Sequence, residues 1–295
     1  MKKWIIAPGN ASEELADRLG NELGTNILDI ETKLFHDGES KITIQGNVNN
    51  KNVILLQSTY PPTDRHILQL LFMAYNLNKN GANVYAVIPY LAYSRQDKMF
   101  LEGETVSLSV LSKMLEMVNI KKMITIDIHN EKSLDYFNFP TVNLSAVSII
   151  AQYFKDKIKI NNTFAVSPDF GSSNRVKEFA KYLDIDHIIM KKSRDRKTGK
   201  VTIDSISKKI DGNDIIFIDD MISTGTSISQ ATIELKKNGV NNVYASCTHP
   251  LLVNNAIDNL RNSEVDEIIG TNTIPTSVSK IDITSIISSY FSSIS

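Results

Sequence analysis

The residues most able to do chemistry are two adjacent carboxylates, Asp219 and Asp220, which precede a loop of small hydroxyl-bearing residues. An apolar run, Ile215 to Asp219, leads into them, and the loop, Ser223 to Ser227, opens a segment of helical period. Successive N–H groups and hydroxyls at a helix N-terminus can bind a phosphate group. The carboxylates repel phosphate, but they accept hydrogen bonds from sugar hydroxyls beside it. This pattern predicts a sugar-phosphate site.

The loop consists of Ser223, Thr224, Gly225, Thr226 and Ser227. It resembles the phosphate loop of type I phosphoribosyltransferases, in which two acidic residues and a Thr-Gly-Thr-like turn hold ribose 5-phosphate. Thr226 stands where a glycine is common in that family, and it adds a Cβ where the backbone must approach phosphate closely. The alternative is an ordinary strand-end turn with Ser227 as the helix N-cap, which accounts for only one or two of these residues.

Four further segments resemble ribose-phosphate pyrophosphokinases, and they follow the order of that family along the whole chain. They are Phe35-His36-Asp37-Gly38-Glu39, Pro89-Tyr90-Leu91-Ala92-Tyr93-Ser94-Arg95-Gln96-Asp97, Asp127-Ile128-His129 and Val166-Ser167-Pro168-Asp169. The resemblance implies an enzyme that moves the terminal diphosphate of ATP onto C1 of ribose 5-phosphate. It also implies a homo-oligomer in which the nucleotide site lies near a subunit interface.

The resemblance assigns ATP binding to Phe35, Asp37, Gly38, Glu39, Arg95 and Gln96. The residue types suit that role, because an aromatic ring can stack on adenine and carboxylates can accept from its amino group or from ribose hydroxyls. The Arg95 guanidinium can bind phosphate oxygens with two hydrogen bonds. Taken alone, Asp37-Gly38 is an ordinary turn and Arg95 a solvated cation at a strand end.

The same resemblance assigns Mg²⁺ to His129 and Asp169, although magnesium prefers oxygen ligands. It assigns catalysis to a mobile basic loop in which Lys192 and Arg194 match the Lys-x-Arg spacing of the family. Lys191 is the alternative lysine, and a solvated hairpin tip is the alternative for the whole basic run. Phe170 departs from the family pattern beside Asp169, and so leaves the surroundings of the metal or phosphate open.

Short apolar runs alternate with amphipathic segments, which is typical of α/β layering with mainly parallel sheets. The runs are Trp4 to Ala7, Val53 to Gln57, Val84 to Pro89, Met123 to Ile128, Phe164 to Ser167, Ile215 to Asp219 and Val243 to Cys247. The chain also matches itself at an offset of about 160 residues, with Gln57-Ser58 standing where Asp219-Asp220 stands in the second half. We therefore expect two tandem copies of one α/β domain, 1–145 and 146–280, and the family resemblance implies that each is of the phosphoribosyltransferase type. A C-terminal helix in 281–295 follows, and its packing partner is left open.

The composition excludes several classes of function. The 295 residues carry 32 basic and 33 acidic side chains, which favours neither nucleic acid nor an anionic membrane as a partner. No apolar run approaches 18 residues, and the single cysteine, Cys247, lies in an apolar run, so we expect a cytoplasmic protein with a buried reduced thiol. Two alternatives to a ribose-phosphate pyrophosphokinase remain, a non-catalytic regulatory paralogue and a base-salvage phosphoribosyltransferase.

Overall fold

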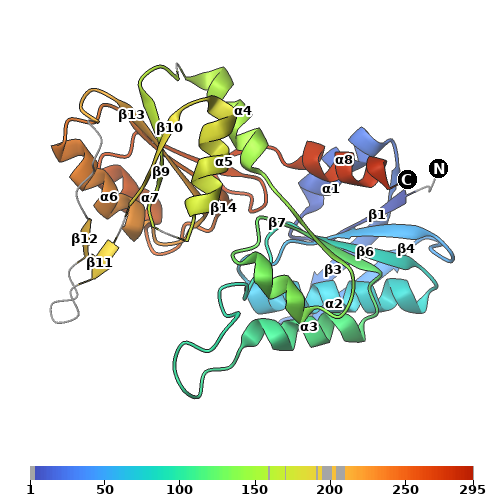
Figure 1. The fold of residues 1–295 in the computed structure, drawn as a ribbon. Helices are drawn as coiled ribbons and strands as arrows, with labels where there is room; N and C mark the ends of the chain where they lie inside the picture. The colour runs from blue at the N-terminus through green and yellow to red at the C-terminus, as the bar shows by residue number, and fades with distance from the viewer. Residues whose placement is uncertain are drawn as a thin grey trace. The chain divides into compact units, whose positions relative to one another are not determined.

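The computed structural model describes residues 4–158, 160–169, 171–190, 192–194, 201–203 and 210–294, with the backbone alone for 192–194 and 201–203. The chain divides into two compact units. Unit 1 comprises Met1–Ser145 and Ile283–Ser295, and unit 2 comprises Ala146–Asp282. Each unit contains one six-stranded parallel sheet with its own helices (Figure 1), which confirms the predicted α/β class with two parallel sheets.

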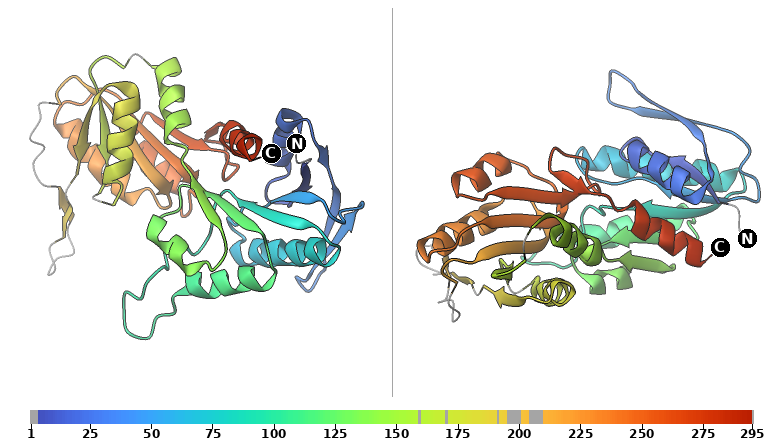
Figure 2. Two further views of the ribbon diagram at one scale, coloured as in Figure 1. Left: turned by 45° about the vertical axis from the view of Figure 1, so that its right-hand side comes forward. Right: turned by 90° about the horizontal axis from the view of Figure 1, so that it is seen from above.

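The sheet of unit 1 has the strand order β2-β1-β5-β6-β7-β8. Its strands are β1 (Trp4–Pro8), β2 (Asn26–Ile27), β5 (Asn52–Leu56), β6 (Asn83–Ile88), β7 (Lys122–Ile126) and β8 (Thr141–Leu144). Its helices are α1 (Glu13–Leu23), α2 (Thr63–Lys79), α3 (Ser107–Met117), the 3-10 helix η1 (Glu131–Tyr136) and α8 (Thr284–Ser293). Helices α1 and α8 lie on one face of the sheet, and α2 and α3 on the other (Figure 1). An antiparallel hairpin, β3 (Asp29–Leu34) and β4 (Ser40–Gln45), extends away from this sheet (Figure 2).

The sheet of unit 2 repeats this order as β10-β9-β13-β14-β15-β16. Its strands are β9 (Thr163–Ser167), β10 (Asp186–Ile189), β13 (Asp214–Ile222), β14 (Val243–Pro250), β15 (Glu267–Thr271) and β16 (Ser279–Ile281). Its helices are α4 (Val147–Lys157), α5 (Ser173–Leu183), α6 (Thr226–Lys237) and α7 (Ala256–Asn262), and its hairpin is β11 (Lys192–Arg194) with β12 (Val201–Ile203). Helices α4 and α5 cover one face of the sheet, and α6 and α7 cover the other (Figure 2).

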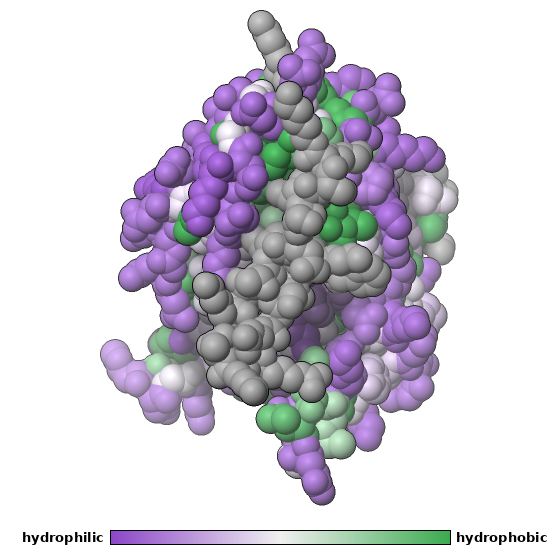
Figure 3. All heavy atoms as spheres, turned by 60° about the vertical axis from the view of Figure 1, so that its left-hand side comes forward, coloured by the Kyte–Doolittle hydropathy of each residue, from purple (hydrophilic) through white to green (hydrophobic). Residues whose placement is uncertain are grey.

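The central strands of both sheets are built around continuous apolar runs, because helices cover both of their faces. Val53, Ile54, Leu55 and Leu56 of β5 have no exposed surface, and neither does the run Ile215 to Ile218 of β13. The face of the molecule drawn in Figure 3 is mainly hydrophilic, with small separate apolar areas. Among the described residues, no helix combines the length and the apolar character needed to cross a membrane.

The C-terminal helix α8, whose partner the sequence left open, packs against α1 of unit 1. The ring of Phe291 lies edge-on to the ring of Trp4 with 4.8 Å between centroids, and Phe291 is fully buried. The Ser288 hydroxyl donates a hydrogen bond to the Glu22 carboxylate. The end of the chain therefore completes the core of the first unit.

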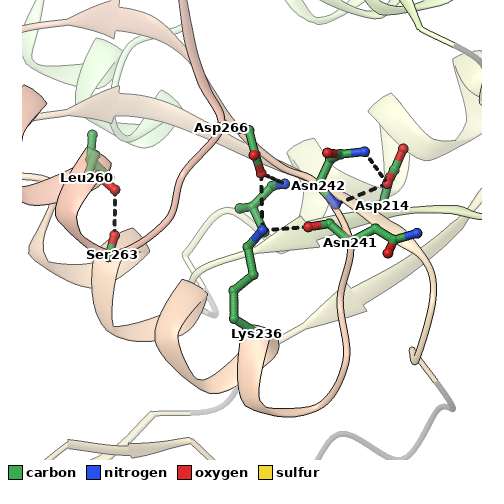
Figure 4. A network of polar contacts seen from close by, with 8 residues as sticks. Asp214, Lys236, Asn241, Asn242, Leu260, Ser263 and Asp266 are labelled. Carbon is green, nitrogen blue, oxygen red and sulfur yellow. Dashed lines mark hydrogen bonds and ion pairs between the residues drawn. The ribbon is translucent and has the colours of Figure 1, made fainter.

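The unit 2 sheet has an amino edge, where its parallel strands begin, and a carboxyl edge, where they end, and the two differ in chemistry. At the amino edge, a polar network joins the starts of neighbouring strands (Figure 4). The Asn242 side chain donates to Asp214 at 2.9 Å, and the Val243 N–H donates to Asp266 at 2.7 Å. Lys236 pairs with Asp266 at 3.2 Å. These groups satisfy one another, so this edge is structural, and the residues predicted to bind sugar phosphate lie at the opposite edge.

Candidate active site

The acidic pair belongs to β13 itself. The prediction ended this strand at Asp219, but β13 continues through Asp220 to Ile222. The extension pairs with β14, so that Asp219 lies opposite Cys247 and Met221 opposite His249. A parallel neighbour that runs equally far holds the carboxylates in extended backbone, which the local sequence could not reveal.

The Asp219 carboxylate lies in a strongly acidic and mostly buried environment. Burial and then the charge of Asp220 raise its pKa from the ordinary 3.8 to about 8, and the charge of Asp169 acts in the same direction. The Ser172 hydroxyl and the Asp220 N–H, the latter at 2.9 Å, donate to the Asp219 carboxylate. The Asp219 carboxylate can thus accept a hydrogen bond from a hydroxyl group.

The predicted phosphate loop forms a turn whose N–H groups are available to a ligand. Gly225 is the N-cap of α6 with φ of 71°, and the helix begins at Thr226. The interpretation of Ser227 as the N-cap is therefore wrong, because Gly225 reaches the left-handed conformation that turns the chain into the helix. Within the described part of the chain, the backbone N–H groups of 223 to 226 have no hydrogen-bond acceptor. Four donors at a helix N-terminus suit an anion.

Close packing also restricts the loop to glycine at position 225. A Cβ on Gly225 would lie 2.9 Å from Cγ of Leu260, a buried residue of α7. The hydroxyls of Thr224 and Thr226 lie 3.0 Å apart on the same turn. The loop therefore presents hydroxyls and backbone donors together, on a helix held in place by its neighbour.

Asp169 lies just beyond β9, which is the neighbour of β13 in the sheet. Its Oδ1 accepts the Gly171 N–H at 2.9 Å, and no donor to Oδ2 is present among the described residues. Asp169, Asp219 and Asp220 thus come together at the carboxyl edge of one sheet, where open α/β sheets bind their ligands. The sequence missed Ser172, which lies beside this group, because a serine before a helix has the same signal as an ordinary N-cap.

The Phe35 to Glu39 segment of unit 1 forms the tip of the β3–β4 hairpin. The Phe35 N–H donates to the Glu39 carbonyl at 2.8 Å, and the Glu39 N–H donates to Asp37 at 3.1 Å. Gly38 has φ of 93°, which explains the glycine in this turn. Phe35 is 40% exposed at the end of this hairpin, and the Lys33 ammonium lies over its ring at 5.4 Å from the centroid.

Arg95, Gln96 and His129 follow β6 and β7, neighbouring strands at the carboxyl edge of the unit 1 sheet. Arg95 and Gln96 are exposed, and Gln96 accepts the Ser107 hydroxyl at 2.6 Å. Next to them, Asp97 accepts from the Asn130 side chain, which ties the two motifs together. The sequence did not anticipate this link, because nothing along the chain marks which two strand ends are neighbours.

The side chains of Lys192 and Arg194, the predicted catalytic residues, lie outside the described residues, as do Lys191 and Phe170. The backbone of 192–194 forms β11, antiparallel to β12. In the described ranges, no group of three or more His, Cys, Asp or Glu side chains forms a metal cage. Cys247 is buried, as expected, and burial raises the pKa of its thiol.

A family model described as the N-terminal domain of ribose phosphate pyrophosphokinase matches residues 4–118, and one for the phosphoribosyl synthetase-associated domain matches residues 200–294. The crystal structure of phosphoribosylpyrophosphate synthetase from Mycobacterium smegmatis superposes with a TM-score of 0.90 at 24% identity over 99% of both chains, so the two proteins share the fold. This confirms the expected pair of tandem phosphoribosyltransferase-type domains.

Curated relatives cover nearly the whole chain. The ribose-phosphate pyrophosphokinase of Sulfolobus acidocaldarius is 36% identical over 95% of this chain and 96% of its own length. That of Methanobrevibacter smithii is 33% identical over 95% and 97%. The chain belongs to the ribose-phosphate pyrophosphokinase family.

Proposed function

We propose that this chain performs the reaction of its family through a division of labour between its two units. The enzyme transfers the diphosphate of Mg-ATP to the C1 hydroxyl of ribose 5-phosphate, which yields 5-phosphoribosyl 1-diphosphate and AMP for nucleotide biosynthesis. The observation that carries the proposal is the carboxyl edge of unit 2, where an acidic pair on β13 adjoins a turn of open N–H donors. A sugar phosphate matches this edge, because its hydroxyls and its phosphate need opposite partners.

Ribose 5-phosphate binds in unit 2 in this proposal. Residues 223 to 227 hold the 5-phosphate, and Asp219 and Asp220 accept from the ribose hydroxyls. Oriented this way, the C1 hydroxyl oxygen attacks the β-phosphorus of ATP in line and forms a bond to it. The bond between the β-phosphorus and the oxygen that bridges it to the α-phosphate breaks, and AMP leaves. Catalysis then consists mainly of positioning and of neutralising charge.

Mg²⁺ is the proposed cofactor, with His129 and Asp169 as ligands by family resemblance. The acidic edge of unit 2 suits a cation, because the charges of Asp169 and Asp220 act on Asp219 and Oδ2 of Asp169 is open among the described residues, although the described side chains form no three-ligand cage. A full protein cage is not needed, since magnesium keeps waters and binds substrate phosphates. When bound, the ion supplies positive charge to the diphosphate oxygens. The imidazole of His129 fits magnesium less well than a carboxylate does.

The basic hairpin supplies the remaining positive charge. Lys192 and Arg194 close over the diphosphate as negative charge develops on it, with Lys191 as the alternative lysine. Such groups stabilise the transition state more than the ground state, so they act on kcat.

ATP is bound from unit 1 in this proposal. Phe35 stacks on adenine, Asp37 and Glu39 accept from the nucleotide, and Arg95 and Gln96 bind its phosphates and orient it. The exposed tip that carries Phe35 is suited to reach a neighbouring subunit, which supports a homo-oligomer with the nucleotide near an interface. We place the enzyme in the cytoplasm.

The decisive assay mixes purified protein with ribose 5-phosphate, Mg²⁺ and ATP and follows AMP and ADP by chromatography. We expect AMP only when the sugar phosphate is present. ADP would indicate ordinary phosphoryl transfer. Saturable binding of both substrates without turnover would instead identify a regulatory paralogue.

A further inference from the structure

A short segment behind the phosphate loop holds that loop by its backbone. This brace segment, residues 251–255, follows β14 and precedes α7. The Leu252 N–H donates to the Ile222 carbonyl and the Val253 N–H donates to the Ser223 carbonyl, each at 3.0 Å. Two consecutive carbonyls, the last of β13 and the first of the phosphate loop, thus accept hydrogen bonds from two consecutive N–H groups of the brace segment.

This pairing decides which way the loop N–H groups point. In a trans peptide, the carbonyl of one residue and the N–H of the next lie on opposite sides. Because the carbonyls of Ile222 and Ser223 face the brace segment, the N–H groups of Ser223 and Thr224 face away from it. In extended backbone, consecutive carbonyls point in opposite directions. The carbonyls of Ile222 and Ser223 both face the brace segment, so the chain turns at Ser223. The brace therefore aligns two adjacent donors on the open side of the loop.

The brace segment adopts an unusual backbone conformation to reach these carbonyls. Leu252, Asn254 and Asn255 have φ of 49°, 53° and 58°. Asparagine tolerates this region, but leucine rarely occupies it, and surrounding contacts must hold it there. The Leu252 side chain packs on the apolar core of unit 2, which supplies such contacts. Strain of this kind persists where the rest of the structure enforces it.

We propose that Leu252 is a positioning residue of the ribose 5-phosphate site, whose core packing keeps the brace segment left-handed and so aims the Ser223 and Thr224 N–H groups at the 5-phosphate. The proposal rests on the assignment of the loop to ribose 5-phosphate. Leu252 itself touches no substrate, and its side chain acts only through the backbone.

The test compares Leu252→Ala with Leu252→Gly. Both variants lose the side-chain packing equally, but alanine keeps a Cβ that disfavours positive φ, whereas glycine adopts it freely. We expect Leu252→Ala to raise KM for ribose 5-phosphate about fivefold above that of Leu252→Gly, the ratio that matches the strain of one left-handed residue. Because phosphate is bound equally before and during the reaction, kcat should be the same in both variants.

Asp184→Ala is the matched control. Asp184 ends α5 in the same unit with φ of 54° and belongs to no proposed site. It should lower Tm and leave KM for ribose 5-phosphate unchanged. Calorimetric titration of each variant with ribose 5-phosphate alone checks binding without turnover.

The proposal would be contradicted if the two Leu252 variants had equal KM values and equal affinities for ribose 5-phosphate, or if Leu252→Gly bound it more weakly than Leu252→Ala. If Leu252→Ala does not fold, Leu252→Gly decides alone, since binding near that of the wild type supports the brace and a tenfold loss contradicts it. If the wild-type protein binds ribose 5-phosphate but forms no AMP, the proposed reaction is refuted. The role of Leu252 can then still be tested, because calorimetry compares the affinities of the two variants for ribose 5-phosphate.

Discussion

The two units place different side chains at the end of the same central strand. In unit 2, β13 carries Asp219 and Asp220, with the open loop beyond them. In unit 1, β5 leads into Gln57 and Ser58, which are 0% and 1% exposed. Gln57 accepts the Ala11 N–H at 3.1 Å. The end of β5 is thus closed by hydrogen bonds within unit 1, whereas β13 ends in two carboxylates beside an open turn.

The loops that follow these strands differ in the same way. In unit 1, Pro61 and Pro62 precede α2 and have no N–H to donate, and the Thr59 N–H is bound by the Tyr90 carbonyl at 3.0 Å. In unit 2, residues 223 to 226 all have N–H groups. The same topology therefore supports a phosphate site only where the loop after its central strand keeps free donors.

The helices that complete each core are also related. Phe291 of α8 lies 6.5 Å from Tyr85 in unit 1, and Phe154 of α4 lies 5.9 Å from Tyr244 in unit 2. Each helix follows the last strand of the other unit along the chain. We expect Phe291→Ala and Phe154→Ala each to lower the free energy of unfolding by about 3–5 kcal/mol in chemical denaturation. A small loss in only one variant would show that the two helices are not equivalent.

The two hairpins provide a second contrast, because the unit 2 hairpin carries the basic residues. Lys192→Ala should lower kcat by about 10²–10³-fold with little change in KM for ribose 5-phosphate, as expected when a charge acts on the transition state. Steady-state kinetics with both substrates varied provide the measurement, and Lys191→Ala is the matched control. A larger effect at Lys191 would transfer the role to that residue.

The acidic pair can be tested by removing one charge. Asp220→Asn should raise KM for ribose 5-phosphate by about 10–100-fold, because a hydrogen bond to a charged group is lost. Asp214→Asn, at the structural amino edge of the same strand, should lower Tm and leave KM unchanged. Similar KM values in the two variants would remove Asp220 from the sugar site.

Gly225→Ala tests the phosphate loop against Gly212→Ala. Their φ values are 71° and 74°, but only position 225 has a neighbour, Leu260, within 4 Å of the added Cβ. Backbone strain should cost both variants about 1–2 kcal/mol of stability. Gly225→Ala should show a further loss and a raised KM for ribose 5-phosphate. Equal KM in both variants would mean that the loop tolerates a side chain.

The smallest expected effect is the pH dependence that Asp219 contributes. Its pKa is about 8 in the folded protein and 3.8 ordinarily, so the native state binds the proton more tightly. The stabilisation from this proton is complete below pH 4 and is lost as pH rises through 8. Between pH 7 and 8, in a chelator without substrates, the stability of the wild type should fall by roughly 1 kcal/mol more than that of Asp219→Asn. Parallel pH profiles would contradict the raised pKa.

Much of the fold was predictable, because buried parallel strands are apolar throughout and helices repeat every 3.6 residues. The runs Val53 to Gln57 and Val84 to Pro89 correspond to β5 and β6 within one residue at each end. The end of β13 was not predictable, because its last residues are held by β14 and not by their own propensity. The site residues were recognisable from their types and spacing, and their roles stay predictions.

Residue types and order along the chain by themselves determined the family, the duplicated α/β plan and the contrast between Gln57-Ser58 and Asp219-Asp220. These properties depend on neighbouring or regularly spaced residues, so they can be recognised in the sequence alone. Only the tertiary structure decided the packing of α8 on α1, the raised pKa of Asp219 and the contact of the brace segment with the phosphate loop. Each depends on segments that meet through folding, and neither burial nor the direction of a peptide plane can be computed from neighbours in sequence.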